Sequence, residues 1–450
     1  DRFTAVRSFD KALDFDPTFL EAFEAIANIL NQDRDYARQD RYYRKMLKRA
    51  LENKLDDKLV FTLGKGLGEI NRTRLKNYSE AIKAYKIALV RKPDDIDTHQ
   101  IIAQLYELED DSEAAIAQYA TLLRHDPRSV ETYRNMKKLY LEIGRFDEAW
   151  CVCQALCFLQ VANEEEKEFF AKRRARSLKG TAQLSQQQWA LINHPLKSAY
   201  LDQLLSILYP ILMPAMARNL KDFGLHRRKS VVDPRGEQPV NVVFSHIHKL
   251  TGLERPTVYQ GMENARGVLN INANPPGIAI GPDAMQPSSV QSLCFDVARG
   301  AFLAAQPYLL ASFPEDADYK SRQVRVKKTL YSLMKVINPS SQAQHDAGLV
   351  ELFSSQLQSD GLRVVTKLLG EMSQDAATHL DATRWLDGVD LTADRLGLVC
   401  SNDLAHAVNA MKNGPCNLGK IEMTEKIKEL IIFSVSPEYM KLRSALGIAQ

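Results

Sequence analysis

Apolar residues in the first third of the chain recur at helical spacing, in blocks that end at prolines. Pro93 and Pro127 lie 34 residues apart, and each is preceded at matching offsets by a small residue and a tyrosine. These positions are Ala81, Ala115, Tyr85 and Tyr119. Small residues let two helices approach closely, and proline ends the second helix of a pair. The pattern therefore predicts helical hairpins that stack into a solenoid, because a single hairpin cannot bury its apolar face alone.

The first helix of each hairpin shows the 0, 3, 4, 7 spacing of one buried helix face. The sets are Phe23, Ile26, Ala27 and Leu30; His99, Ile102, Ala103 and Tyr106; and Tyr133, Met136, Lys137 and Tyr140. One unit is irregular, since Gln39 takes a small-residue position and residues 71–76 form an insertion. Residues 77–95 and 111–129 closely resemble the tetratricopeptide consensus. We therefore expect a tetratricopeptide solenoid over residues 1–175.

The resemblance implies that the first helices of successive hairpins line a concave groove in which partner segments dock. The polar residues between the core positions of two such helices become the candidate partner-binding residues. They are Gln100, Gln104, Arg134, Asn135 and Lys138. A polar, mildly basic groove suits the backbone or the carboxylates of a protein partner. For any one of these residues a solvated helix face is the simpler interpretation, and the carboxylate clamp of chaperone-binding tetratricopeptide domains is not reproduced in order.

The pattern changes after about residue 175. Residues 164–176 are strongly charged and residues 176–196 are polar, which predicts a capping helix followed by a linker. Short stretches of alternating apolar residues between about 255 and 282 predict a small sheet, and helix-length segments precede and follow it. We therefore expect a mainly α chain, with an α+β domain over residues 197–450 after the solenoid.

Two segments of this second half resemble gluzincin metallopeptidases. Residues 391–411 resemble the Glu-Ala-Asp-Arg-x-Gly-Leu helix of that family, and residues 289–307 correspond by position to its His-Glu-x-x-His helix. The resemblance places Thr392 at the glutamate ligand and Arg299, Gly300 and Leu303 at the histidine and glutamate positions. Zinc needs imidazole or carboxylate donors, and its water needs a glutamate base, so the implied activity is lost. The alternative is a coincidental match on a buried helix.

This combination resembles long tetratricopeptide proteins of myxobacteria and related bacteria, which end in a degenerate zincin-like domain. We expect no metal, cofactor or catalytic site. His246 and His248 point to different sides of a helix. His379 with Asp381 and His406 with Asp403 could be acid–base pairs, but a helix-capping or surface role is the better interpretation. Cys151, Cys153 and Cys157 are expected to fill small gaps in the repeat core.

Composition disfavours several further classes of function. The net charge is +3, and no basic stripe suggests nucleic acid. The longest apolar run, residues 204–216, contains two prolines and is too short to predict membrane insertion. Six cysteines form no disulfide framework, which favours a cytoplasmic protein, and the chain begins inside a repeat, so we expect residues upstream.

We therefore expect a protein-interaction scaffold that binds protein partners through the groove, with the inactive peptidase-like domain as a second binding surface. One alternative is a metallopeptidase with unusual ligands such as His246, His248 or His406. The other is a structural subunit of a larger assembly.

Overall fold

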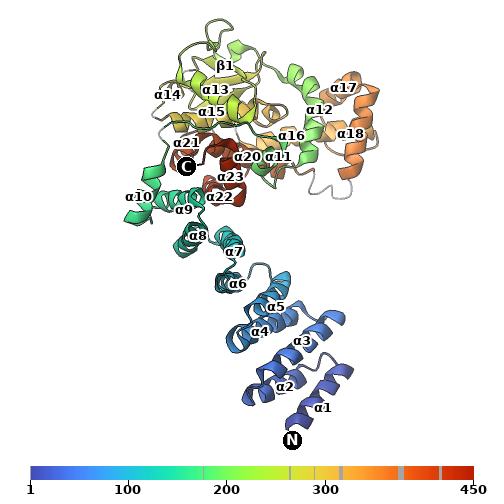
Figure 1. Ribbon diagram of the computed structural model, residues 1–450. Helices are drawn as coiled ribbons and strands as arrows, with labels where there is room; N and C mark the ends of the chain where they lie inside the picture. The colour runs from blue at the N-terminus through green and yellow to red at the C-terminus, as the bar shows by residue number, and fades with distance from the viewer. Residues whose placement is uncertain are drawn as a thin grey trace. The chain divides into compact units, whose positions relative to one another are not determined.

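The computed structural model describes residues 2–175, 177–262, 265–287, 289–313, 318–372, 380–414 and 418–449. Helices dominate these ranges, together with one small sheet (Figure 1). Contacts divide the chain into two compact units, Asp1–Val152 and Cys153–Gln450. The division falls within α9 (Phe146–Phe158). The domain limits at residues 175 and 197 stay a prediction.

The first unit is a stack of helices in chain order, as Figure 1 shows. Its helices are α1 (Arg2–Phe15), α2 (Leu20–Gln32), α3 (Tyr36–Glu52), α4 (Asp57–Glu69), α5 (Tyr78–Arg91), α6 (Ile96–Leu108), α7 (Ser112–His125) and α8 (Val130–Glu142). Several of them begin at a side-chain cap that accepts a hydrogen bond from the first turn, namely Asp35, Asn77, Asp95, Asp111 and Ser129. The α-solenoid predicted from the repeats is confirmed.

Small residues at the repeat positions allow this stacking. Ala81, Ala103 and Ala115 are fully buried, and Tyr85 and Tyr119 are buried beside them. Gly64 of α4 shows how tight the packing is. A Cβ added there would lie 3.0 Å from the backbone nitrogen of Ala88 on α5, so it would fit only if a neighbour moved by a few tenths of an ångström.

Most of the insertion predicted at residues 71–76 lies in a π-helix, η1 (Ile70–Leu75). The buried Asn71 side chain donates hydrogen bonds to Asp40 Oδ1 at 2.7 Å and to the Leu67 carbonyl at 3.0 Å. Lys76 then takes a left-handed conformation with φ of 54°, and the next residue caps α5. The extra residues therefore widen one turn without displacing the next hairpin.

The second unit places a small sheet among helices, as predicted. The strands β1 (Thr257–Gln260), β2 (Val268–Ile271) and β3 (Gly277–Ile280) lie in the order β1-β3-β2, with β1 parallel and β2 antiparallel to β3. Before the sheet come α10 (Glu164–Arg173), α11 (Gln186–Ile192), α12 (Ala199–Met216), η2 (Leu220–Phe223) and α13 (Pro239–Thr251). After it come α14 (Pro282–Met285), α15 (Val290–Ala304), η3 (Tyr308–Ala311), α16 (Tyr319–Ile337), α17 (Ala347–Gln356), α18 (Ser359–Met372), α20 (Ala382–Ser401), α21 (Leu404–Asn413), α22 (Met423–Ser434) and α23 (Pro437–Leu446).

The core of the second unit is the pair α15 and α20, which are buried over most of their length. Glycines bring α15 close to its neighbours. A Cβ on Gly397 of α20 would lie 2.6 Å from the ring of Phe295, and a Cβ on Gly300 would lie 2.6 Å from Val268 of β2. Helix α15 is therefore held between the sheet and α20.

Within the described ranges, α12 is the one helix long and apolar enough to cross a membrane by length and composition. A third of its 18-residue span is buried in the second unit, and Pro210 and Pro214 lie inside it. Core helices of globular proteins pass the same test. The expectation of no membrane insertion stays a prediction.

Candidate functional site

Four charged side chains are buried together where α15, α20 and α22 meet. They are Arg299, Asp390, Asp394 and Lys426, here called the charge cluster, and their side chains are only 2–10% exposed. Arg299 Nε lies 2.7 Å from Asp394 Oδ1, and its guanidinium also binds Asp390. Lys426 Nζ lies 2.9 Å from one oxygen of each aspartate. Two cations thus balance two carboxylates.

The sequence builds this arrangement through helix periodicity. Asp390 and Asp394 are four residues apart on α20, so both carboxylates lie on the face that meets Arg299. Burial raises the pKa of Asp390, but Lys426 and Arg299 outweigh that effect and hold the pKa below its ordinary value. Burial lowers the pKa of Arg299, yet the two aspartates raise it further, so the guanidinium stays charged.

Thr392, the residue expected at the glutamate-ligand position, lies outside the charge cluster. This residue is two positions from each aspartate, so its side chain points to the opposite face of α20. There its hydroxyl donates to the Gly388 carbonyl at 2.6 Å and accepts from the His194 amide at 3.0 Å. The carboxylates that face Arg299 are therefore Asp390 and Asp394.

The two remaining expected positions also lie outside the charge cluster. Gly300 packs against β2, and its carbonyl accepts a 2.8 Å hydrogen bond from Asn270 Nδ2. Leu303 is buried in the core. Of the four positions named from the resemblance, Arg299 alone belongs to the cluster. Sequence reasoning missed Asp390 and Lys426; the available signal was a pair of aspartates at helical spacing within an otherwise mostly apolar segment.

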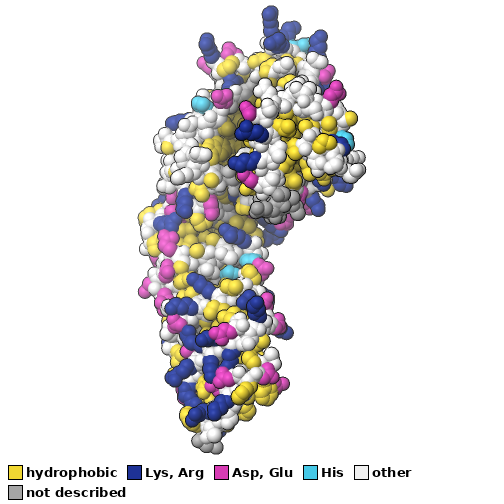
Figure 2. Space-filling view, turned by 90° about the vertical axis from the view of Figure 1, so that its right-hand side faces the viewer, with side chains coloured by type: hydrophobic (Ala, Val, Ile, Leu, Met, Phe, Trp, Pro, Cys, Tyr) yellow, Lys and Arg dark blue, Asp and Glu magenta, His cyan; other side chains and the backbone are white. Residues whose placement is uncertain are grey.

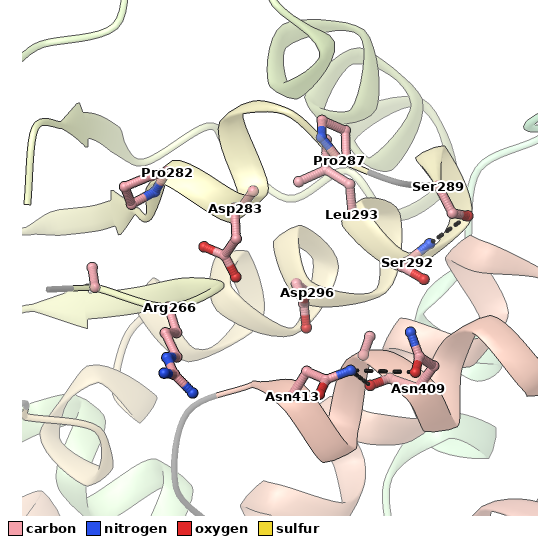
Figure 3. Close-up of a pocket in the computed structure, with 13 residues that line it drawn as sticks. Arg266, Pro282, Asp283, Pro287, Ser289, Ser292, Leu293, Asp296, Asn409 and Asn413 are labelled. Carbon is pink, nitrogen blue, oxygen red and sulfur yellow. Dashed lines mark hydrogen bonds between the residues drawn. The ribbon is translucent and has the colours of Figure 1, made fainter. Parts of the chain in front are cut away.

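A cleft of about 510 Å³ lies beside the cluster, between α14, α15, α21 and the start of β2. Figure 3 shows Arg266, Asp283, Asp296 and Asn413 extending toward it from these different elements. Its lining residues are Ala265, Arg266, Pro282, Asp283, Ala284, Pro287, Ser289, Ser292, Leu293, Asp296, Asn409, Ala410 and Asn413. We call it the α15–α21 cleft. It combines charged, amide and hydroxyl groups with small apolar patches.

Asp296 connects the cleft to the charge cluster. It lies three residues before Arg299 on α15 and also borders a small internal cavity lined by Arg299 and Lys426. Burial raises the pKa of Asp296 to about 7, although Arg299 lowers it. In the ranges that the structure describes, no group donates a hydrogen bond to this carboxylate. By contrast, both oxygens of Asp283 accept from the Gly267 amide at 3.0 Å.

Hydrogen bonds fix the polar rim of the cleft. Asn413 Nδ2 donates to the Asn409 carbonyl at 2.9 Å and to Asn409 Oδ1 at 3.2 Å (Figure 3). Ser289 caps α15 by accepting from the Ser292 amide at 3.3 Å. The Ser292 hydroxyl donates to the carbonyl of His406 at 3.3 Å, which joins α15 to α21. The rim is therefore held in place before any ligand arrives.

The predicted partner-binding residues lie on α6 and α8 of the first unit. Gln100 and Gln104 are exposed one turn apart on α6, and Arg134 and Lys138 are exposed one turn apart on α8. These four and Asn135 are here called the α6–α8 face. In Figure 2, Lys and Arg side chains are interspersed with Asp and Glu along the visible face of the first unit, without one continuous basic patch.

The structure connects part of this face to neighbouring helices. Asn135 Nδ2 donates to the Tyr119 hydroxyl of α7 at 3.2 Å. Lys138 Nζ lies 3.5 Å from Glu107 Oε2 of α6 and 3.8 Å from Glu142 Oε1 of α8. The role of the five residues in partner binding stays a prediction.

The histidines make local contacts. His246 Nε2 lies 3.1 Å from the Cys400 carbonyl, and His248 Nδ1 lies 2.9 Å from the Leu253 carbonyl. Asp403 caps α21, as expected, and His406 lies beside it. Among the described residues no group of three or more His, Cys, Asp or Glu side chains could hold a metal ion. The pair of His379 with Asp381 cannot be placed, because His379 lies outside the described residues.

No protein-family model and no curated protein sequence matches this chain. Among solved structures, the crystal structure of MamA is 21% identical, with a TM-score of 0.25, over 38% of this chain and 92% of that one. The TPR2AB domain of yeast Sti1 in complex with pHSP90 is 13% identical, with a TM-score of 0.17, over 37% of this chain and 74% of that one. Naa15/Naa10 bound to HypK-THB is 14% identical, with a TM-score of 0.28, over 99% of this chain and 60% of that one. Because these TM-scores are low, the description of the first unit is based on its own repeats and helices.

Proposed function

We propose that the chain is a protein-interaction scaffold. The first unit binds an extended segment of a partner protein on the α6–α8 face, and the second unit is a catalytically inactive zincin-like domain that offers another binding surface. One observation carries the first part: two successive first helices of the solenoid expose polar side chains at matching turns, above core positions that are buried.

The chemistry of the α6–α8 face suits an extended acidic segment. The amides of Gln100 and Gln104 both donate and accept, as an exposed peptide backbone requires. Lys138 is 60% exposed, and its two ion pairs are long, at 3.5 and 3.8 Å. Such pairs contribute little to stability, so a partner carboxylate can replace them at small cost.

The charge cluster supports the proposal that the zincin-like domain is inactive. Between α15 and α20, both carboxylates are already bonded to a guanidinium and an ammonium group. A divalent cation placed there would face two buried positive charges and would have to compete with them for the carboxylates. Arginine and lysine thus take the role that a metal ion would otherwise have, which is to neutralise the carboxylates.

Affinity capture with the full chain tests the scaffold proposal. The variant Arg134→Glu with Lys138→Glu reverses the charge of the α6–α8 face. Its matched control, Lys83→Glu with Arg124→Glu, makes the same changes on the second helices α5 and α7. We expect the wild type and the control to retain the same partners, cross-linked to α6 and α8, and the first variant to lose them. Equal capture by both variants would contradict the proposal.

A further inference from the structure

We propose that the α15–α21 cleft binds the ammonium group of a lysine side chain from a protein partner, with Asp296 as its counter-ion. This inference rests on the proposed function, because it names the chemistry of the second binding surface. The cleft volume of about 510 Å³ is enough for a side chain and part of its backbone.

The first argument is that the Asp296 carboxylate lacks a hydrogen-bond donor among the described residues. Its side chain is half-buried at the cleft and receives no hydrogen bond from the described residues. The nearest cation on the same helix, Arg299, directs its bonds to Asp390 and Asp394 instead. A half-buried carboxylate without a protein donor loses part of its hydration, and a ligand that supplies N–H groups offsets that loss.

The second argument is the charge balance. The charge cluster is neutral by itself, since two cations face two carboxylates. The described residues that line the cleft include Asp283, Asp296 and Arg266, which leave one net negative charge when Asp296 is ionised. An incoming cation balances that charge, whereas an anion would add to it.

The third argument favours lysine over arginine. An ammonium group donates three hydrogen bonds from one atom, so it can bind a carboxylate and an amide oxygen together, whereas a guanidinium pairs bidentately with a carboxylate alone. The Asn413 amide nitrogen is occupied by Asn409, which leaves the Asn413 amide oxygen as an acceptor on the rim. Asp296 and Asn413 both line the cleft (Figure 3), and we expect a single ammonium group to contact both.

The test uses the full chain and two small probes in saturation-transfer NMR titrations. Nα-acetyl-lysine amide carries the ammonium group, and Nα,Nε-diacetyl-lysine amide is its neutral counterpart. We expect the charged probe to bind at least about tenfold more tightly than the neutral one, as a charge-assisted hydrogen bond implies. Equal binding of the two probes, or tighter binding of Nα-acetyl-arginine amide, would overturn the inference.

Variants locate the site. Asp296→Asn should weaken binding of the charged probe about tenfold or more, and Asn413→Leu should weaken it by a smaller factor. Asp360→Asn is the matched control, because that side chain is 95% exposed on α18, and binding should not change. If Asp296→Asn bound the charged probe with wild-type affinity, the inference would be wrong. The α6–α8 variant Arg134→Glu with Lys138→Glu should still bind the probe, so failure of the scaffold proposal and failure of this one are separate outcomes.

Discussion

Replacing Arg299 by methionine should destabilise the second unit by about 3–5 kcal/mol. The Arg299 side chain is 10% exposed, and it pairs with both Asp390 and Asp394. Methionine fills much of the same volume without a charge. The variant leaves two buried carboxylates with Lys426 as their only cationic partner in the cluster. The cost therefore comes from one uncompensated buried charge rather than from lost packing.

Thermal or urea unfolding followed by tryptophan fluorescence measures this effect. Trp189 and Trp385 belong to the second unit, and Trp385 Nε1 donates to Asp202 Oδ1 at 2.8 Å in the folded state. For a unit of this size, 1 kcal/mol corresponds to a shift of roughly 2 °C, so we expect a fall of about 6–10 °C. Far-ultraviolet circular dichroism checks that the variant still folds.

The double variant Arg299→Met with Asp394→Asn isolates the charge effect. It leaves Lys426 opposite Asp390 and restores the balance of charge. Groups in one ion-pair network are not additive, so the double variant should be more stable than the sum of the single changes predicts by about 1–3 kcal/mol. A cost below about 1 kcal/mol for Arg299→Met, or simple additivity, would refute the reasoning.

Three further predictions follow from other features. Because burial holds the pKa of Asp296 at about 7 in the folded state, stability should be fully present below about pH 4 and decrease as pH rises through 7. Asp296→Asn should therefore raise the melting temperature at pH 8 and have little effect at or below pH 4; an equal effect at both pH values would contradict this. The purified chain should hold well under one zinc per chain by elemental analysis, and a chelator should not shift its melting; one equivalent of zinc would favour the metallopeptidase alternative. Gly64→Leu should destabilise the first unit by about 1–3 kcal/mol in circular-dichroism melts, because a side chain there meets the backbone at Ala88. Gly370→Leu, where nothing lies within 4 Å, is its control, and equal effects would argue against close packing at Gly64.

The solenoid could be predicted from the sequence because its contacts are local. Each hairpin packs mainly on its neighbours in the chain, so one period fixes which residues are small and which are buried. Ala81 and Ala115 are the clearest cases, since both were marked by their distance from a proline and both are fully buried. The sequence indicated the π-helix only as an insertion, because its geometry depends on the hydrogen bond from Asn71 to Asp40 on another helix.

The charge cluster could not be predicted in the same way. Which face of α20 turns inward depends on its packing against α15, and the apolar residues around Asp390 do not distinguish one face from another. Lysine is almost never fully buried, so the sequence alone predicts that Lys426 lies on the surface. Its burial requires two aspartates from a helix about thirty residues earlier in the chain, which no local pattern reveals.

Stability alone does not explain why a protein keeps a buried ion network, because replacing such a network with apolar residues is often neutral or stabilising. Here the reason follows from Asp296. Without its aspartate partners, we expect the Arg299 guanidinium, three residues along the same helix, to pair with Asp296 and to compete there with a ligand cation. Asp394 instead accepts from Arg299 Nε and Asp390 accepts from Arg299 Nη2, while Lys426 pairs with both aspartates. The cluster thereby leaves Asp296 available to a ligand, and the variant Asp390→Asn with Asp394→Asn should release Arg299 and abolish binding of the lysine probe. Undiminished binding in that variant would show that the cluster and the cleft are independent.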